Sequence, residues 1–116
     1  MQITNQTIHG GNQQFADSII NEYPNAKFEQ HDIELLKFIA ELKTEVATKQ
    51  AAGNDVAIIN DHTVTREARE NAHNRITQFL LDHKSDISAW TGRVSKIVIT
   101  AILAKYGLSL ADVGLL

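Results

Sequence analysis

The sequence predicts a mainly α-helical fold, a single domain of three helices preceded by a short β-hairpin at the N-terminus. Two stretches carry apolar residues at helical spacing, a third is apolar on nearly every side, and a polar N-terminal segment contains Gly10-Gly11-Asn12. The 116 residues suffice for one core and are few for two. We therefore expect a polar hairpin over residues 1–24 and a helical domain over residues 25–116 that share one core.

The glycine pair predicts the hairpin, because Gly-Gly and Gly-Asn steps tolerate the positive φ angles of tight turns. Residues 2–9 and 13–20 would form its two arms, and the second arm has no cleanly apolar face. A ribbon of this kind is barely stable alone, and its unpaired edges can bind another chain. Either a second copy or a partner completes the ribbon, or the N-terminus is loosely docked.

The first helix is predicted over about residues 32–50, after the turn signal at Tyr23-Pro24-Asn25. Gly53-Asn54 follows as a stop signal. Residues 55–60 fit either a short strand or a packed loop, and the sequence leaves both open. The apolar stripe of this helix comprises Leu35, Phe38, Ile39, Leu42 and Val46.

The second helix should begin near Asp61 or Thr63, since either side chain can cap free amides, and should run to about Asp82. Its apolar stripe comprises Val64, Ala68, Ala72, Ile76, Phe79 and Leu80.

The third helix should begin near Ser85 or Asp86 and end before Gly107. One face carries Ile87, Trp90, Val94, Ile97, Val98, Ala101 and Ile102, while Ile99 and Leu103 lie on the reverse. A helix that is apolar on nearly all sides is buried in a core or at an interface.

Two other helices cover such a helix poorly, so we expect either the N-terminal ribbon or a second copy of the chain to cover it. A symmetric helix-on-helix dimer is a familiar solution. The sequence therefore favours a homo-oligomer, and the interaction residues predicted for it are Ile8, Phe15, Ile19, Trp90, Ile99 and Leu103.

One segment, "REARENAHNR", contains candidate catalytic and metal-binding residues. Arg66 and His73 lie seven residues apart on one helix face, a spacing similar to the Arg and His of HEPN-type nucleases. His73 would act as acid or base on a ribose hydroxyl while Arg66 holds a phosphate. This face points away from the alanine stripe, so we expect His73 to be exposed, and a ribonuclease is the enzymatic alternative. Glu70 and His73 also match a Glu-x-x-His metal motif, but the motif occurs once where such sites need it twice, so no metal or other cofactor is predicted.

Composition and charge exclude or disfavour several classes of partner, site and location. A net charge of −3 gives no basic field, so a nucleic-acid partner is disfavoured. The longest apolar window, residues 87–103, is interrupted by Arg93 and Lys96 and predicts no membrane span. Cysteine is absent, which excludes disulfides and thiolate metal sites. With no recognisable secretion signal, the expected location is the cytoplasm.

The order of the segments "IHGGNQQFADSI", "LLKFIAELKTEV" and "VSKIVITAILAKYGL" resembles small helical adaptor or oligomerisation modules of bacterial conflict and signalling proteins. The resemblance covers most of the chain. It implies contact with another protein or with a second copy, and no catalytic residues. The function predicted is thus a non-enzymatic protein-protein interaction or self-association module. A small acidic inhibitor or immunity-type protein is a further alternative that the charge permits.

Overall fold

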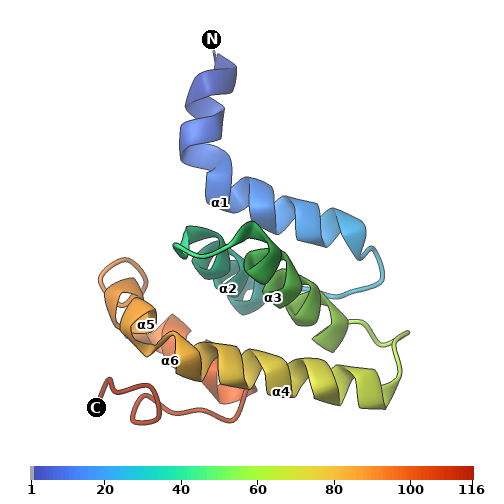
Figure 1. Ribbon diagram of the computed structural model, residues 1–116, viewed down its shortest axis with the longest axis vertical. Helices are drawn as coiled ribbons and strands as arrows, with labels where there is room; N and C mark the ends of the chain where they lie inside the picture. Colours follow the sequence, from blue (N-terminus) through green and yellow to red (C-terminus); the bar gives the residue numbers. More distant parts are fainter. Residues whose placement is uncertain (1) are drawn as a thin grey trace.

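The fold is mainly α-helical, as predicted. The computed structural model describes residues 2–116, with side chains from Asn12 onward, and this part of the chain forms six helices and no strand (Figure 1). The helices are α1 (Gln2–Glu22), α2 (Gln30–Glu41), α3 (Val46–Ile59), α4 (Arg66–Asp82), α5 (Lys84–Trp90) and α6 (Lys96–Lys105). Three main helices were expected, and the higher count has a separate cause in each region.

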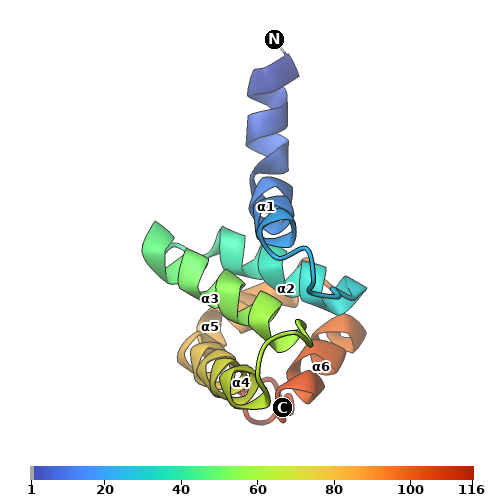
Figure 2. The ribbon, with the colours of Figure 1, turned by 90° about the vertical axis from the view of Figure 1, so that its right-hand side faces the viewer.

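The helices stack in three layers. Helices α2 and α3 form the middle layer, α1 lies on one side of them, and α4, α5 and α6 lie on the other (Figure 2). The chain beyond α6 curls back beneath the third layer (Figure 1). The largest fully buried side chains come from every helix except α3, which adds the smaller Ala52, Val56 and Ala57 to the same continuous core. The large ones are Ile19, Leu35, Leu36, Phe38, Ile39, Ile76, Leu80, Ile87, Trp90, Ile99, Ile102 and Leu103.

The predicted N-terminal hairpin is wrong, because Gln2–Glu22 form one helix. Its ribbon bends near the middle, where the sequence has Gly10-Gly11, and the first half projects away from the body (Figures 1 and 2). Glycine pairs are common sites of helix kinks. The second half docks because Ala16 and Ile19, three residues apart, face the core and are fully buried. As a strand, the same segment would place Ala16 and Ile19 on opposite faces, which is why the predicted arm had no cleanly apolar face.

Gly53 was expected to stop the first helix. It instead lies buried inside α3, where α1 packs against it. A Cβ atom at Gly53 would lie 2.8 Å from Ile19 Cδ1 and 2.9 Å from Phe15 Cζ. The missing side chain therefore lets the two helices approach closely.

The first predicted helix is two helices. Helix α2 ends at Glu41. The backbone is extended at Leu42 and at Glu45, and α3 starts at Val46. Val46 is 80% exposed, so it does not belong to the buried stripe in which the periodicity placed it. Residues 55–59, left open between strand and loop, are the last turns of α3.

Helix α4 matches its predicted course and ends at Asp82 as expected. Thr65 caps the helix by accepting a hydrogen bond from the Ala68 amide at 3.2 Å. The cap was expected at Asp61 or Thr63, so the helix begins later than predicted. Asp61 instead closes a turn by accepting hydrogen bonds from the amide and the hydroxyl of Thr63, which lower the pKa of its carboxyl group.

The third predicted helix is also two helices. Helix α5 begins at Lys84 and ends at Trp90, and Ser95 caps α6 by accepting from the Val98 amide at 3.4 Å. This break explains the all-round apolar pattern, because the two halves point different faces at the core. Helix α6 ends before Gly107, as expected, and Gly107 adopts φ 73°, a helix-ending conformation suited to glycine.

Among residues 2–116, no helix is both long enough and apolar enough to span a bilayer.

Candidate interaction surface

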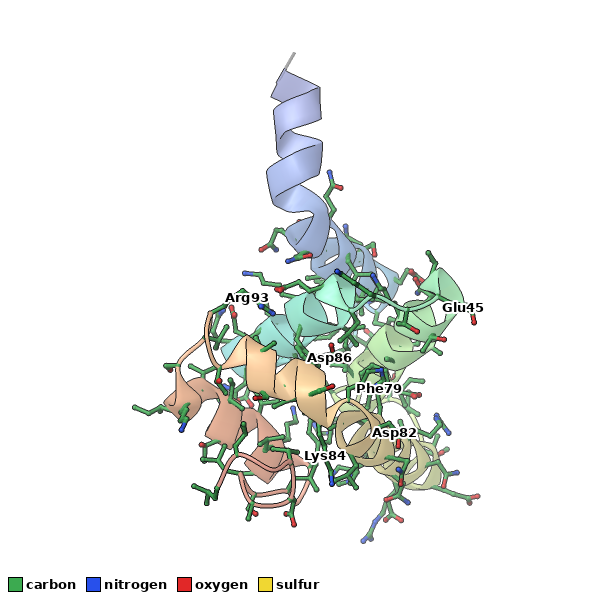
Figure 3. The ribbon with its side chains drawn as sticks, turned by 60° about the vertical axis from the view of Figure 1, so that its left-hand side comes forward. Glu45, Phe79, Asp82, Lys84, Asp86 and Arg93 are labelled. Atoms are coloured by element: carbon green, nitrogen blue, oxygen red, sulfur yellow. The ribbon has the colours of Figure 1, made fainter. Side chains whose placement is uncertain are left out.

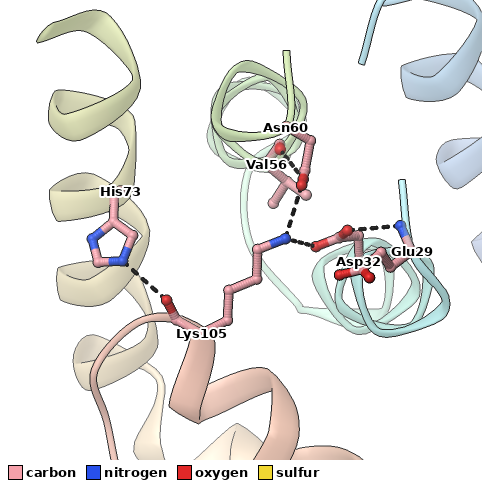
Figure 4. A network of polar contacts seen from close by, with 6 residues as sticks. All are labelled: Glu29, Asp32, Val56, Asn60, His73 and Lys105. Atoms are coloured by element: carbon pink, nitrogen blue, oxygen red, sulfur yellow. Dashed lines mark hydrogen bonds and ion pairs between the residues drawn. The ribbon is translucent and has the colours of Figure 1, made fainter. Parts of the chain in front are cut away.

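Helices α2 and α6 are held together by a buried polar network (Figure 4). The Lys105 ammonium, at the end of α6, donates to Asp32 Oδ1 at 2.6 Å and to Asn60 Oδ1 at 2.8 Å. Asp32 is 1% exposed, and its second oxygen accepts from the Glu29 amide at 2.8 Å. The Asn60 amide group donates to the Val56 carbonyl at 2.8 Å. The network fixes α6 against both α2 and α3, so the surface between α2 and α6 has a defined shape.

An apolar groove runs along that surface. It has a volume of about 320 Å³. Its lining residues are Gln30, His31 and Glu34 of α2, Val94 on the loop before α6, and Ile97, Val98 and Ala101 of α6. Ile97 is 83% exposed, while Val94, Val98 and Ala101 are half-buried. Burying an isoleucine side chain fully is worth about 1.5–3 kcal/mol, so this uncovered side chain is a source of binding free energy. We call these seven residues the α2/α6 groove.

Charges of both signs border the α2/α6 groove. Glu34 accepts from Gln30 at 3.1 Å and pairs with Lys37 at 3.6 Å on the α2 side. Lys96 is exposed beside Ile97 on α6 and makes no ion pair among the described residues. The rim thus carries charges of both signs, which lets two identical surfaces place opposite charges across from each other.

The residues that sequence reasoning chose for interaction lie mostly inside the chain's own core. Ile19, Trp90, Ile99 and Leu103 are at most 1% exposed, and Phe38 stacks on Trp90 with ring centroids 4.3 Å apart. Phe15 is half-buried against the same core. The side chain of Ile8 lies outside the described side chains. The accessible apolar surface is therefore a different set from the one predicted.

The α2/α6 groove was missed because Val94, Ile97, Val98 and Ala101 were assigned to one long buried face. The signal that could have found it is Gly92 followed by Ser95, a helix stop and an N-cap that divide the predicted helix. Once α6 starts afresh at Lys96, its apolar residues exceed what one neighbouring helix can cover.

The two residues of the nuclease alternative do share one shallow hollow, which Ile59, Arg69 and Glu70 line together with Arg66 and His73. Arg66 pairs with Glu70 at 3.0 Å, as the spacing of four residues predicts.

The expectation that His73 is exposed is wrong. His73 is half-buried because its ring packs against Tyr106 at 5.2 Å and its Nε2 lies 3.1 Å from the Lys105 carbonyl oxygen. A carbonyl only accepts, so Nε2–H donates and is occupied in tying α4 to α6. Beneath it, burial raises the pKa of the Tyr106 phenol, whose hydroxyl has no partner among the described residues.

Metal ligands do not gather in the part of the chain that the structure describes, where no three histidine or carboxylate side chains are placed to share an ion. Glu70 and His73, the half-motif, have no second pair beside them.

Comparison of the chain with protein-family models, with curated proteins and with solved structures finds no match in any of the three. The resemblance to bacterial adaptor modules therefore stays a prediction.

Proposed function

We propose that the protein is a non-enzymatic interaction module that self-associates through the α2/α6 groove. The observation that carries this proposal is Ile97, a large apolar side chain 83% exposed beside an apolar groove on a rigidly held pair of helices. An exposed apolar patch with a polar rim is typical of a protein-binding site.

A second copy of the chain is the occupant that fits the rim. In a twofold dimer the same surface faces itself, so each groove receives the Ile97 of the other copy. Lys96 and Glu34 lie on different helices at the border of this surface, so the Lys96 of one copy can lie opposite the Glu34–Lys37 pair of the other and contact the Glu34 carboxylate. A partner of one charge sign would leave half of this rim unmatched.

The association should be weak. Stable complexes bury about 800 Å² on each partner, whereas the groove offers one largely exposed isoleucine and its half-buried neighbours. We expect a dimer that forms at micromolar to millimolar concentration.

Size exclusion with light scattering over a concentration series tests this proposal. Ile97→Asp should shift the dimer to monomer, because it places a charge in the apolar centre. Val46→Asp is the matched control, since Val46 is 80% exposed on α3, away from the groove, and the variant should associate as the wild type does. A wild-type chain that stays monomeric at millimolar concentration, or an equal effect of the two variants, would refute self-association through this surface.

Removing the N-terminal segment is a poor test of self-association. Ala16 and Ile19 belong to the core, so a chain that starts at Pro24 would lose stability whatever its oligomeric state.

A further inference from the structure

A second hollow, separate from the α2/α6 groove, lies where the end of α2, the start of α5 and two loops meet. It is a half-open hollow with a volume of about 580 Å³, within the size range of small-molecule sites. The lining residues are Phe38, Glu41, Leu42, Lys43, Thr44, His83, Asp86, Ala89 and Arg93. We call this hollow the α2/α5 cavity. Figure 3 shows Asp86 on α5 and Arg93 on the loop beyond it, with Glu45 at the start of α3 across from them.

Two interactions hold the walls of the α2/α5 cavity in place. Arg93 Nη2 lies 2.8 Å from Glu41 Oε1, which joins the loop after α5 to the end of α2 and neutralises both charges. His83 Nδ1 lies 2.7 Å from the Phe79 carbonyl oxygen, and its ring packs on Phe79 at 4.3 Å. Since the carbonyl only accepts, Nδ1 donates this hydrogen bond, and Nε2 remains available for a further polar contact.

Two charged side chains at the cavity, both exposed to solvent, have no protein partner among the described residues. Lys43, on the loop after α2, and Asp86, on α5, make no ion pair or side-chain hydrogen bond there, so their charges are open to a ligand in place of water. They carry opposite signs and belong to different walls. An anion alone would meet Asp86, and a cation alone would meet Lys43, so neither suits the cavity as well as a molecule that carries both charges.

We propose that the α2/α5 cavity binds a small zwitterion of the α-amino-acid class. Asp86 receives the ammonium group and Lys43 receives the carboxylate. His83 Nε2 and the Thr44 hydroxyl offer further polar contacts, and Leu42 and Ala89 supply apolar wall for the side chain of the ligand. Binding here is independent of the α2/α6 groove, so neither proposal depends on the other.

Titration of the isotope-labelled full chain with L-leucine, followed by NMR, tests the proposal. The signals of His83, Asp86 and Lys43 should shift with a millimolar dissociation constant. Leucine amide, which lacks the carboxylate, and isocaproate, which lacks the ammonium group, should each bind about fivefold or more weakly, since a half-exposed charge pair is worth up to about 1 kcal/mol.

Variants assign the two charges. Lys43→Gln should weaken L-leucine binding about fivefold without changing the affinity for leucine amide, and Asp86→Asn should do so without changing the affinity for isocaproate. Lys84→Gln and Asp82→Asn are the matched controls, because these residues lie close by in Figure 3 but outside the lining, and they should bind as the wild type does. No shift at saturating L-leucine, equal binding of the three compounds, or equal effects of the control variants would overturn the proposal.

Discussion

The polar network between α2 and α6 makes an asymmetric prediction about stability. Lys105→Met leaves the Asp32 carboxylate, 1% exposed, without its cation. Asp32→Asn instead leaves the Lys105 ammonium, whose side chain is 24% exposed and can reach water. Breaking a buried pair costs about 3–5 kcal/mol when the remaining charge is fully buried. We therefore expect Lys105→Met to lower the free energy of unfolding by about 3 kcal/mol and Asp32→Asn by about half of that.

Urea denaturation followed by circular dichroism at neutral pH measures both values. The double variant should lose at least about 1 kcal/mol less than the sum of the two single losses, because it leaves no unpaired charge. Lys37→Met serves as control, since its pair with Glu34 spans 3.6 Å at the partly exposed surface and should contribute under about 1 kcal/mol. Equal losses in the two single variants, or additive losses in the double variant, would refute this reasoning.

Two further predictions concern single packing sites. Gly53→Ala gains up to about 1 kcal/mol of helix propensity but places a Cβ 2.8 Å from Ile19 Cδ1, and overpacking costs about 1–3 kcal/mol. We expect a net loss of about 1 kcal/mol in urea denaturation, and a stabilised variant would show that α1 does not pack on Gly53. Tyr106→Phe removes an unpartnered buried hydroxyl and should stabilise the chain by about 1 kcal/mol at neutral pH. Burial raises the pKa of Tyr106 above its ordinary value of 10.0, so the wild type should lose stability as the pH rises past that value. The variant should lose less. Its remaining loss would come from Tyr23, whose pKa is also raised by burial. Parallel pH profiles of the two chains would contradict this prediction.

Helical periodicity predicted the helical class and one whole helix from the sequence. Helix α4 was found at its proper end because its stripe is regular and no internal break interrupts it. The other boundaries depended on single residues whose effect is set by tertiary contacts. Gly53 reads as a stop, but the neighbouring Ile19 makes it a site of close helix packing. Gly10-Gly11 reads as a hairpin turn, but local propensity yields to the burial of Ala16 and Ile19.

The candidate surfaces could be predicted less well than the fold. Ile97 and Trp90 have the same apolar character in the sequence, yet one is exposed and the other fully buried. The difference arises from the helix break between them, which rotates α6 relative to α5. Lys43 and Asp86 both line the α2/α5 cavity although they lie more than forty positions apart in the sequence. No local sequence pattern predicts that they share a cavity.

The pairing of Asp32 with Lys105 also has a consequence for chain synthesis. These residues lie 73 positions apart, so the carboxylate leaves the ribosome long before the ammonium that neutralises it. Helices α1, α2 and α3 can pair early through neighbouring segments, but the site around Asp32 cannot close without the last helix. We expect the nascent chain to remain loosely packed at the start of α2 until α6 emerges, and the final step of folding to be the docking of α6. The buried start of α2 thus depends for its closure on a segment synthesised much later than itself.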